Sequence, residues 1–298
     1  MWTAASFLTA IANVHVFSSN GRRAVHKPLL ILLAIANVEG GGRGIVSFQD
    51  IERQLEELIA EFGNTASVAN RPRAHYPFWY LRNDGFWFVE EEEKFAPRKG
   101  KGTWGEPSVV ALREAPARAG FFPEVAALLI ADRELRRQAV VTLLQQSFPE
   151  TRRQDVIDAV GLTLRDALLA VRDPKFRQDV LREYGFRCAV CGFDGRIHSS
   201  SVGLEAAHIK MLSFGGPSDI TNGLALCALH HKLFDAGAIT IEPSSFAVSV
   251  SARFAGLSLG VQAVIGAADT PIQHMPIRKS CRPAESNLAW HRSQVFVE

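Results

Sequence analysis

The chain has little of three features that often identify a protein's class: charge of one sign, cysteine and long apolar runs. Its 298 residues include 33 Lys and Arg against 31 Asp and Glu, and the balance holds in each half, so no domain is strongly basic. Four cysteines are too few for a disulfide scaffold in a chain of this length. The longest apolar run, 28–38, is too short to span a bilayer, so we expect a cytoplasmic protein without membrane contact.

Any contact with nucleic acid must therefore come from short basic segments. Phosphate attraction supplies most of the non-specific affinity for DNA, and basic loops are suited to it. Each segment taken alone is equally well explained as an ordinary solvated loop. The candidates are residues 20–27 (NGRRAVHK), 70–76 (NRPRAHY) and 97–105 (PRKGKGTWG).

The first half of the chain predicts a helical domain with a β-hairpin. Apolar residues recur at helical spacing near the N-terminus, a second helix opens at Pro28, and a third begins at Ser47 or Asp50. Two aromatic-rich runs then flank Asp84-Gly85, a pair that supplies the positive φ angles of a tight turn. Three helices followed by a hairpin resemble a winged-helix arrangement.

The second half has the pattern of an α+β domain behind a hinge. A long helix is expected over 123–148, and the segment 148–155 (FPETRRQD) is expected to be the hinge that follows it. After it, a short helix leads into a Cys-x-x-Cys knuckle, residues 202–209 are typical of a strand, 224–237 of a helix, and two strands follow. This is a ββα unit behind a cysteine knuckle. The predicted domains are 1–150, 174–298 and a linker over 151–173.

Four residues have the spacing of a closed zinc site. Cys188 and Cys191 form one pair with a two-residue gap, and Cys227 and His230 form another. A Cys₃His set is suited to tetrahedral structural Zn²⁺. The alternative is that His230 lies in the core or on the surface and that Cys227 is a buried apolar residue. Adjacent helical residues point about 100° apart, so His231 is free to face elsewhere.

The order His208, Asn222, His231 on strand, loop and helix resembles the HNH endonucleases of the ββα-metal class, over residues 174–298. The resemblance implies that His208 is the general base that activates water, since a neutral imidazole titrates at about 6.5. Asn222 would restrain the loop and orient His208. His231 would bind the catalytic divalent ion, Mg²⁺ or Mn²⁺, which neutralises charge on the phosphoryl oxygens.

The ligand set of this ion is incomplete in the sequence. Many members of the class carry a ligand directly before the base, where this chain has Ala207. Asp235 follows His231 at i+4 on one helix face, either as a second ligand or as a helix-end residue. Glu205 is the nearest acid to His208, but strand alternation puts residues three apart on opposite faces.

Two motifs of the first half, HKPLLILL (26–33) and YPFWYLRNDGFW (76–87), look like the sulfur-binding domain of phosphorothioate-dependent restriction endonucleases, over 1–150. The resemblance implies an apolar cup for the phosphorothioate sulfur and cations for flanking phosphates or guanine edges. Tyr76 and Pro77 form the cup, with Tyr80 close by. The other contributors are His26, Lys27, Arg71 and Arg73.

Three functions remain open at this point. The first is a phosphorothioate-dependent endonuclease acting on double-stranded DNA. The family resemblance implies a homodimer, since each HNH site cuts one strand and a monomer would need two binding events to break both. The second is an HNH endonuclease that reads a modified base such as methylcytosine, with the aromatic run as its cage. The third is a non-catalytic, zinc-dependent DNA-binding regulator, which predicts the loss of one HNH residue, whereas all three are present.

Overall fold

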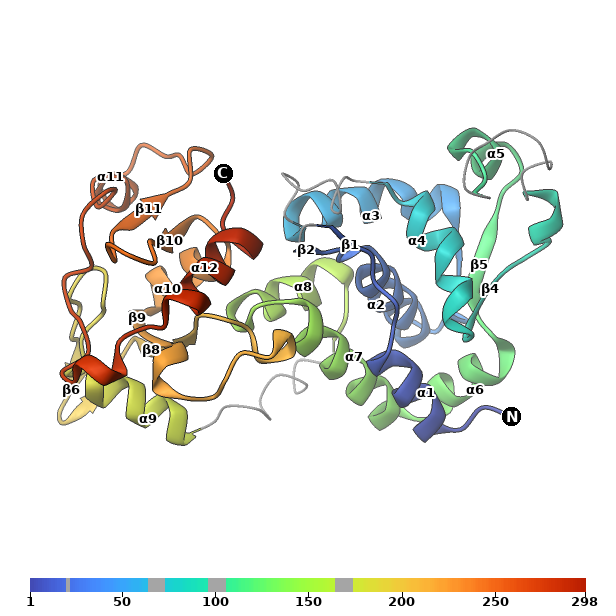
Figure 1. Cartoon of the computed structure of the whole chain (residues 1–298). Coiled ribbons are helices and arrows are strands. Elements are labelled where there is room, and N and C mark those ends of the chain that lie inside the picture. Colours follow the sequence, from blue (N-terminus) through green and yellow to red (C-terminus); the bar gives the residue numbers. More distant parts are fainter. Residues whose placement is uncertain (20–21, 64–72, 96–105, 164–173) are drawn as a thin grey trace. The chain divides into compact units, whose positions relative to one another are not determined.

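The chain forms two compact units, shown in a computed structural model that describes residues 1–19, 22–63, 73–95, 106–163 and 174–298 (Figure 1). The first unit takes Met1–Phe148 and a segment that begins at Arg153. The second takes Pro149–Arg152 and the C-terminal part up to Glu298. The predicted limits of domains and linker stay predictions, because 164–173 lie outside the described ranges.

Helices dominate the first unit, and α2 is its centre. Ten of the 14 residues of α2 are buried, because the helix is apolar on almost every side and packs against α3, α4, α6, α7 and α8. The helices are α1 (Ala4–Ala12), α2 (His26–Glu39), α3 (Phe48–Phe62), α4 (His75–Tyr80), α5 (Val109–Glu114), α6 (Pro123–Ala131), α7 (Arg133–Ser147) and α8 (Arg153–Val160). The helices predicted from Pro28 and Ser47 are thus present as α2 and α3.

A small antiparallel sheet completes this unit. Its strands are β3 (Ile45–Ser47), β4 (Trp87–Val89) and β5 (Arg118–Phe121), in the order β3-β5-β4. A Cβ on Gly120 would lie 2.4 Å from the carbonyl oxygen of Gly44, so the close approach of β3 requires glycine there. The ring of Phe7 packs edge-on against Phe121 at 6.0 Å and ties α1 to the sheet. A two-residue pair, β1 (Ser18–Ser19) and β2 (Arg22–Arg23), lies outside this sheet.

The hairpin predicted over 76–87 is wrong. The first aromatic run forms α4 and the 3₁₀ helix η2 (Leu81–Asp84), and β4 pairs with β5 from thirty residues later. Pro77, Phe78 and Trp79 are consecutive and all buried, which a strand with one buried face cannot achieve. Only the turn was anticipated correctly, since Gly85 has a φ of 81°.

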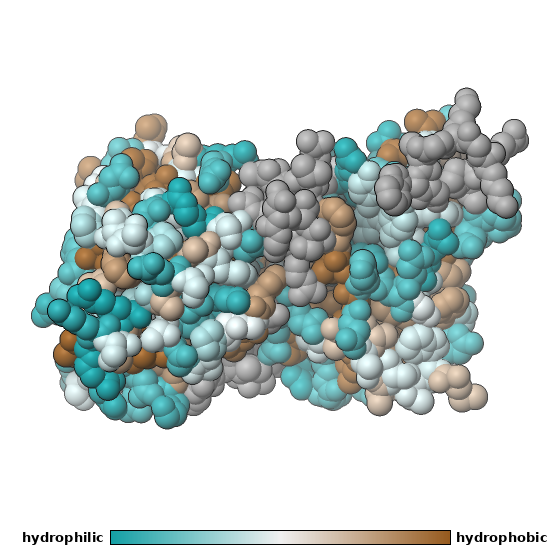
Figure 2. Space-filling view, viewed as in Figure 1, coloured by the Kyte–Doolittle hydropathy of each residue, from teal (hydrophilic) through white to brown (hydrophobic). Residues whose placement is uncertain are grey.

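The prediction of one long helix over 123–148 is wrong as well, because this segment forms two helices, α6 and α7. Asp132 separates them because its side chain accepts a hydrogen bond from the backbone N–H of Leu135, at 3.0 Å, and caps α7. Within the described residues, no helix combines the length and the hydropathy needed to cross a bilayer. On the face drawn in Figure 2, hydrophilic and hydrophobic side chains are interspersed.

The second unit is built on the antiparallel pair β8 (Leu204–His208) and β9 (Gly223–Cys227), with α10 (Ala228–Asp235) packed against both (Figure 1). The strand predicted over 202–209 is β8. The helix predicted over 224–237 is wrong in its first part, because residues 223–227 form β9. This strand pairs with β8 and is buried except at Cys227, and α10 begins only at Ala228. The other elements are α9 (Pro174–Glu183), β6 (Arg196–Ile197), β7 (Ser200–Ser201), β10 (Ile239–Ile241), β11 (Val248–Val250), α11 (Leu259–Ile265) and α12 (Glu285–Gln294).

His291 on α12 anchors the far side of α10. Its ring stacks on Phe234 with 3.5 Å between centroids, and its Nδ1 lies 2.8 Å from the Thr240 hydroxyl. Burial lowers the pKa of His291 to about 3, so the ring stays neutral. His291 is thus a structural residue that fixes α10.

Candidate functional site

Two pairs of residues from distant parts of the second unit form a compact metal-ligand cluster. The ligand atoms of Cys188, Cys191, Cys227 and His230 all lie within 4.8 Å of one another. The Cys191 and Cys227 sulfurs are 3.9 Å apart, and Nδ1 of His230 lies 3.7 Å from the Cys188 sulfur. Thiolates bound to one tetrahedral zinc at about 2.3 Å are about 3.8 Å apart, so the four residues fit a zinc ion.

The backbone holds this cluster in place. The Cys188 N–H donates to the carbonyl of Phe193 at 2.9 Å, and the Ala189 N–H donates to Ala225 of β9 at 2.7 Å, which ties the knuckle to the strand that ends in Cys227. Gly192 has a φ of 71°, which permits the knuckle's turn. Burial alone would lower the pKa of His230, but hydrogen bonds with the three cysteines outweigh it and raise the pKa to about 11. The three cysteines thus surround the His230 ring in the arrangement that a Cys₃His metal site requires.

His208 and Asn222 lie where β8 and β9 meet. His208 is the last residue of β8 and is paired with Gly223, directly after Asn222. The imidazole stacks on Phe176 of α9, with centroids 3.9 Å apart and planes 7° from parallel. Packing on α9 thus sets the plane of the ring.

Asn222 is fully buried and acts on the loop between the strands. Its Oδ1 accepts from the N–H of Lys210 at 2.8 Å, and its Nδ2 donates to the carbonyls of Lys210 and Pro217, each at 2.9 Å. These three hydrogen bonds connect Asn222, at the end of the loop between β8 and β9, with Lys210 near its start and with Pro217 inside it. The polar side chain thereby fixes the backbone beside the predicted base.

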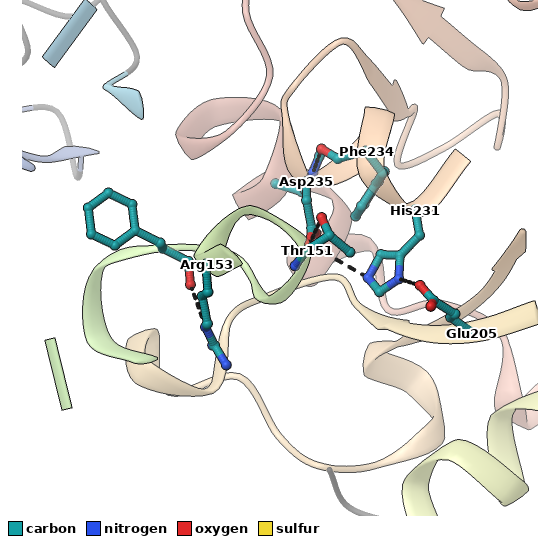
Figure 3. A network of polar contacts seen from close by, with 8 residues as sticks. Thr151, Arg153, Glu205, His231, Phe234 and Asp235 are labelled. Atoms are coloured by element: carbon teal, nitrogen blue, oxygen red, sulfur yellow. Dashed lines mark hydrogen bonds and ion pairs between the residues drawn. The ribbon is translucent and has the colours of Figure 1, made fainter. Parts of the chain in front are cut away.

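His231 lies between two carboxylates, one at each ring nitrogen (Figure 3). Its Nδ1 is 2.7 Å from Oε2 of Glu205, and its Nε2 is 3.6 Å from Oδ2 of Asp235. The imidazole side chain is only 4% exposed. Burial alone would lower the pKa of His231, but the negative charges of Asp235 and Glu205 outweigh it and raise the pKa. His231 faces these acids while its neighbour His230 faces the cysteines.

Glu205 is a site residue that the sequence interpretation missed. Strand alternation predicts that Glu205 points away from His208, and its hydrogen-bond partner is His231 on the helix that covers β8. Residues two apart on a strand share a face, so Glu205 lies on the face of Ala207.

Asp235 is held by the short 3₁₀ helix η4 (Glu150–Arg152), which belongs to the same unit. The backbone N–H of Thr151 donates to Oδ2 of Asp235 at 3.0 Å, and the Thr151 hydroxyl donates to the same oxygen at 2.7 Å (Figure 3). Thr151 is a second residue that the sequence did not indicate. No local sequence motif predicts a contact between Thr151 and Asp235, which are 84 residues apart.

In the first unit, three of the predicted sulfur-binding residues lie together at α4. The Arg73 guanidinium donates to the Tyr76 hydroxyl at 2.6 Å and lies 5.3 Å from the centre of its ring. The rings of Tyr76 and Tyr80 are 6.3 Å apart. Tyr80 donates to Glu106 at 2.9 Å, and burial together with this carboxylate raises the pKa of Tyr80 to about 12. Pro77, the other predicted wall of the cup, is buried.

The remaining predicted residues of this group lie at the start of α2 or outside the described ranges. His26 is buried. Lys27 forms an ion pair with Asp84 at 2.6 Å, and the two side chains are 12% and 5% exposed. Asp84 also accepts from the N–H of His15 at 2.7 Å. Arg71 lies outside the described residues, as do residues 70–72 of the basic segment 70–76 and the whole of the segment 97–105.

Two family models match the chain, in adjacent regions. Residues 4–165 match the family described as "ScoMcrA-like, DNA sulfur-binding domain", and residues 188–242 match "HNH endonuclease". The second match contains His208, Asn222, His231 and all four residues of the metal-ligand cluster. No curated protein matches the chain.

Solved structures with partial similarity include a sulfur-binding domain of ScoMcrA complexed with phosphorothioated DNA, with 21% identity, a TM-score of 0.44, and coverage of 54% of this chain and 98% of that one. The phosphorothioation-dependent restriction endonuclease ScoMcrA gives 20% identity and a TM-score of 0.46, over 67% and 41% of the two chains. The TagI modification-dependent restriction endonuclease gives 24% and 0.33, over 46% and 42%. All three TM-scores are low, so the functional argument rests on the two family matches.

Proposed function

Since the chain belongs to the ScoMcrA-like DNA sulfur-binding domain family, we propose that it recognises phosphorothioated double-stranded DNA and hydrolyses a phosphodiester bond nearby. The observation that carries the proposal is the presence of both matches in one chain, the sulfur-binding domain first and the HNH endonuclease second. The chain is thus a modification-dependent endonuclease. The expected cytoplasmic location stays a prediction.

In the nuclease half, His208 is the proposed general base. Its place at the end of β8 and the stacking on Phe176 hold the plane of the imidazole, and a neutral imidazole held in this way can take a proton from water. Asn222 keeps the following loop closed around this position. His231, flanked by carboxylates, would hold a divalent ion such as Mg²⁺ or Mn²⁺, and that ion supplies charge neutralisation at the phosphoryl group.

The metal-ligand cluster has a separate, structural purpose in this proposal. Cys188, Cys191, Cys227 and His230 would bind Zn²⁺ with no open position, which suits a fold-stabilising site and not a catalytic one. The zinc would join the knuckle, the end of β9 and the start of α10. It would thereby fix the helix that carries His231.

In the first unit, the proposed sulfur pocket is the Tyr76–Pro77 surface of α4. Sulfur is larger and more weakly hydrated than oxygen, so an apolar cup favours it, while an oxygen there would lose hydration without compensation. Arg73, bonded to the Tyr76 hydroxyl, would supply attraction to the flanking phosphates. In this proposal the helices and the three-stranded sheet act as a winged-helix-like reader of DNA, with His26, Lys27, Arg71 and Tyr80 around the pocket.

His208→Ala should abolish cleavage of phosphorothioated duplexes, by at least about 10²-fold, because a positioned base contributes that much or more. Binding of the same duplex and zinc content should stay unchanged. The matched control is His198→Ala, an exposed histidine in the turn between β6 and β7. Cutting by the His208 variant within tenfold of wild type would disprove the base assignment.

Replacement of the neighbouring residues His230 and His231 should impair different properties of the protein. His230→Ala should lower the zinc content and the thermal stability, because structural zinc contributes directly to folding. His231→Ala should keep one zinc equivalent and lose divalent-dependent cutting. Elemental analysis and thermal unfolding of both variants measure this. A full zinc equivalent in both variants would contradict the structural zinc site.

Tyr76→Ala should lose most of the discrimination between phosphorothioated and ordinary duplexes, about 1–3 kcal/mol if one buried contact surface is removed. Tyr76→Phe is the control, since it keeps the ring and loses only the hydroxyl that Arg73 contacts. Binding titrations on paired duplexes that differ in one sulfur measure the effect. Equal discrimination by the Ala variant and wild type would exclude the Tyr76 cup.

Each HNH site cuts one strand, so a double-strand break by a monomer would need two binding events, and we further propose a homodimer. Light scattering at micromolar protein should give twice the 32.7 kDa chain mass. A monomeric mass under conditions of efficient double-strand cutting would contradict this proposal.

A further inference from the structure

A buried ion pair joins the two elements that carry the proposed sulfur pocket. Nζ of Lys27 is 2.6 Å from Oδ2 of Asp84, and the two side chains are only 12% and 5% exposed. Lys27 lies in the first turn of α2, and Asp84 is the last residue of η2, the 3₁₀ helix that directly follows α4. Since α2 packs against α4, the pair connects the helix of Lys27 with the helix of Tyr76 and Pro77.

Asp84 was expected only as part of a turn, but its side chain connects three segments of the chain. Oδ1 accepts a hydrogen bond from the backbone N–H of His15, at 2.7 Å, in the segment that follows α1. Oδ2 accepts from the ammonium group of Lys27. Each carboxylate oxygen thus has its own donor, so the carboxylate is fixed and holds the ammonium group in one place.

The start of α2 would attract anions if Asp84 were absent. The N-terminal end of a helix carries partial positive charge, and free backbone N–H groups there favour phosphate. Lys27 adds a full positive charge at this end, and residues 26–29 (HKPL) contain no acidic side chain. Asp84 supplies the negative charge from η2. The carboxylate therefore offsets the attraction that this end of α2 would have for any DNA phosphate.

We propose that Asp84 is a specificity-determining residue, because it withholds the Lys27 ammonium group from an ordinary phosphate oxygen that enters the sulfur pocket. Asp84 is a positioning residue in this role, since it acts through Lys27 and not on the DNA itself. The inference rests on the proposed recognition of phosphorothioated DNA and deepens it.

Oxygen and sulfur differ in what they need from the pocket. An oxygen that loses its water in an apolar cup loses free energy unless a protein donor replaces the lost hydrogen bonds. Sulfur is more weakly hydrated and loses less in the same place. An ammonium group free to turn into the cup would give the oxygen a charge-assisted hydrogen bond and cancel its penalty. While Asp84 holds Lys27, the penalty against oxygen remains.

A second donor beside the cup is engaged in the same way. The Tyr80 hydroxyl donates to Oε2 of Glu106 at 2.9 Å. The ammonium group of Lys27 and the hydroxyl of Tyr80, two polar groups proposed to lie around the sulfur, thus both have a carboxylate acceptor within the protein. This arrangement is the one expected of a pocket that selects against a hydrogen-bond acceptor. Lys27 is the better subject for a test, because its release also changes the local charge.

The test is a binding titration of full-length Asp84→Asn and wild type against paired duplexes that differ in one sulfur, with divalent ions omitted. Asparagine keeps an oxygen for the His15 N–H and removes the charge that holds Lys27. Affinity for the ordinary duplex should rise at least about fivefold, because a hydrogen bond to a charged group is worth about tenfold or more. Affinity for the phosphorothioated duplex should rise less, so the preference for sulfur falls. The slope of log affinity against log salt should steepen by about one unit if Lys27 gains one phosphate contact.

The control is the same substitution in a Lys27→Met background. The double variant removes both charges, and neutral replacement of a buried pair is tolerated better than the loss of one partner. Asp84→Asn should not raise the affinity for the ordinary duplex in this background, because the donor is absent. Thermal unfolding measures whether each variant is folded. If Asp84→Asn is not folded, Asp84→Ser, which is also compatible with a turn, takes its place in both backgrounds.

Three results would overturn the inference. The first is an unchanged or lower affinity of the folded Asp84 variant for the ordinary duplex. The second is an equal rise for both duplexes, since Asp84 would then set only the general charge of the surface. The third is the same rise in the Lys27→Met background, since Asp84 would then not act through Lys27. Absence of any sulfur preference in wild type would instead contradict the proposed function on which the inference rests.

Discussion

The second unit depends on one constraint: two adjacent imidazoles on α10 must face different partners. The turn of about 100° between neighbouring helical residues allows this only if the helix is held at a fixed rotation. His291 stacked on Phe234 fixes one side of α10, and pairing of β9 with β8 fixes its start. His230 then meets three sulfurs, and His231 meets two carboxylates. A small rotation of α10 would disturb both places at once.

In the first unit, the described charges are largely paired within the protein. Lys27 is neutralised by Asp84, and Arg73 is bound to the Tyr76 hydroxyl. These two cations, which lie in the part of the chain that the structure describes, are engaged within the protein, and this weakens their attraction for ordinary DNA phosphates. A recognition mode that depends on desolvation of one sulfur fits such a surface better than one that depends on charge. The cost of placing an oxygen in the same cup would supply the discrimination.

The spacing of motif residues in the sequence predicted most of the second unit. It did not predict the contacts between side chains on different helices and strands. The paired gaps of Cys188, Cys191, Cys227 and His230 anticipated a cluster that the structure does bring together. Glu205 and Thr151 were missed because their partners lie on other elements, at separations of 26 and 84 residues. The strand β9 was missed because a short buried apolar run fits a helix or a strand equally well.

The failed hairpin in the first unit has a similar cause. Asp84-Gly85 correctly marks a turn, but aromatic content suggested a strand where consecutive burial of Phe78 and Trp79 against α2 requires a helix. Packing on the central helix thus overrode local propensity. The positions of Tyr76 and Tyr80 on one face of α4, which the proposed pocket uses, follow from that packing.

The central claim is that one chain couples sulfur recognition to HNH cleavage. Its most direct test is the rate at which the wild-type protein, with Mn²⁺ present, cuts two duplexes that differ by a single phosphorothioate sulfur. We expect cleavage near the modified site and essentially none of the matched duplex. Equal rates on both duplexes in every sequence context would contradict the account.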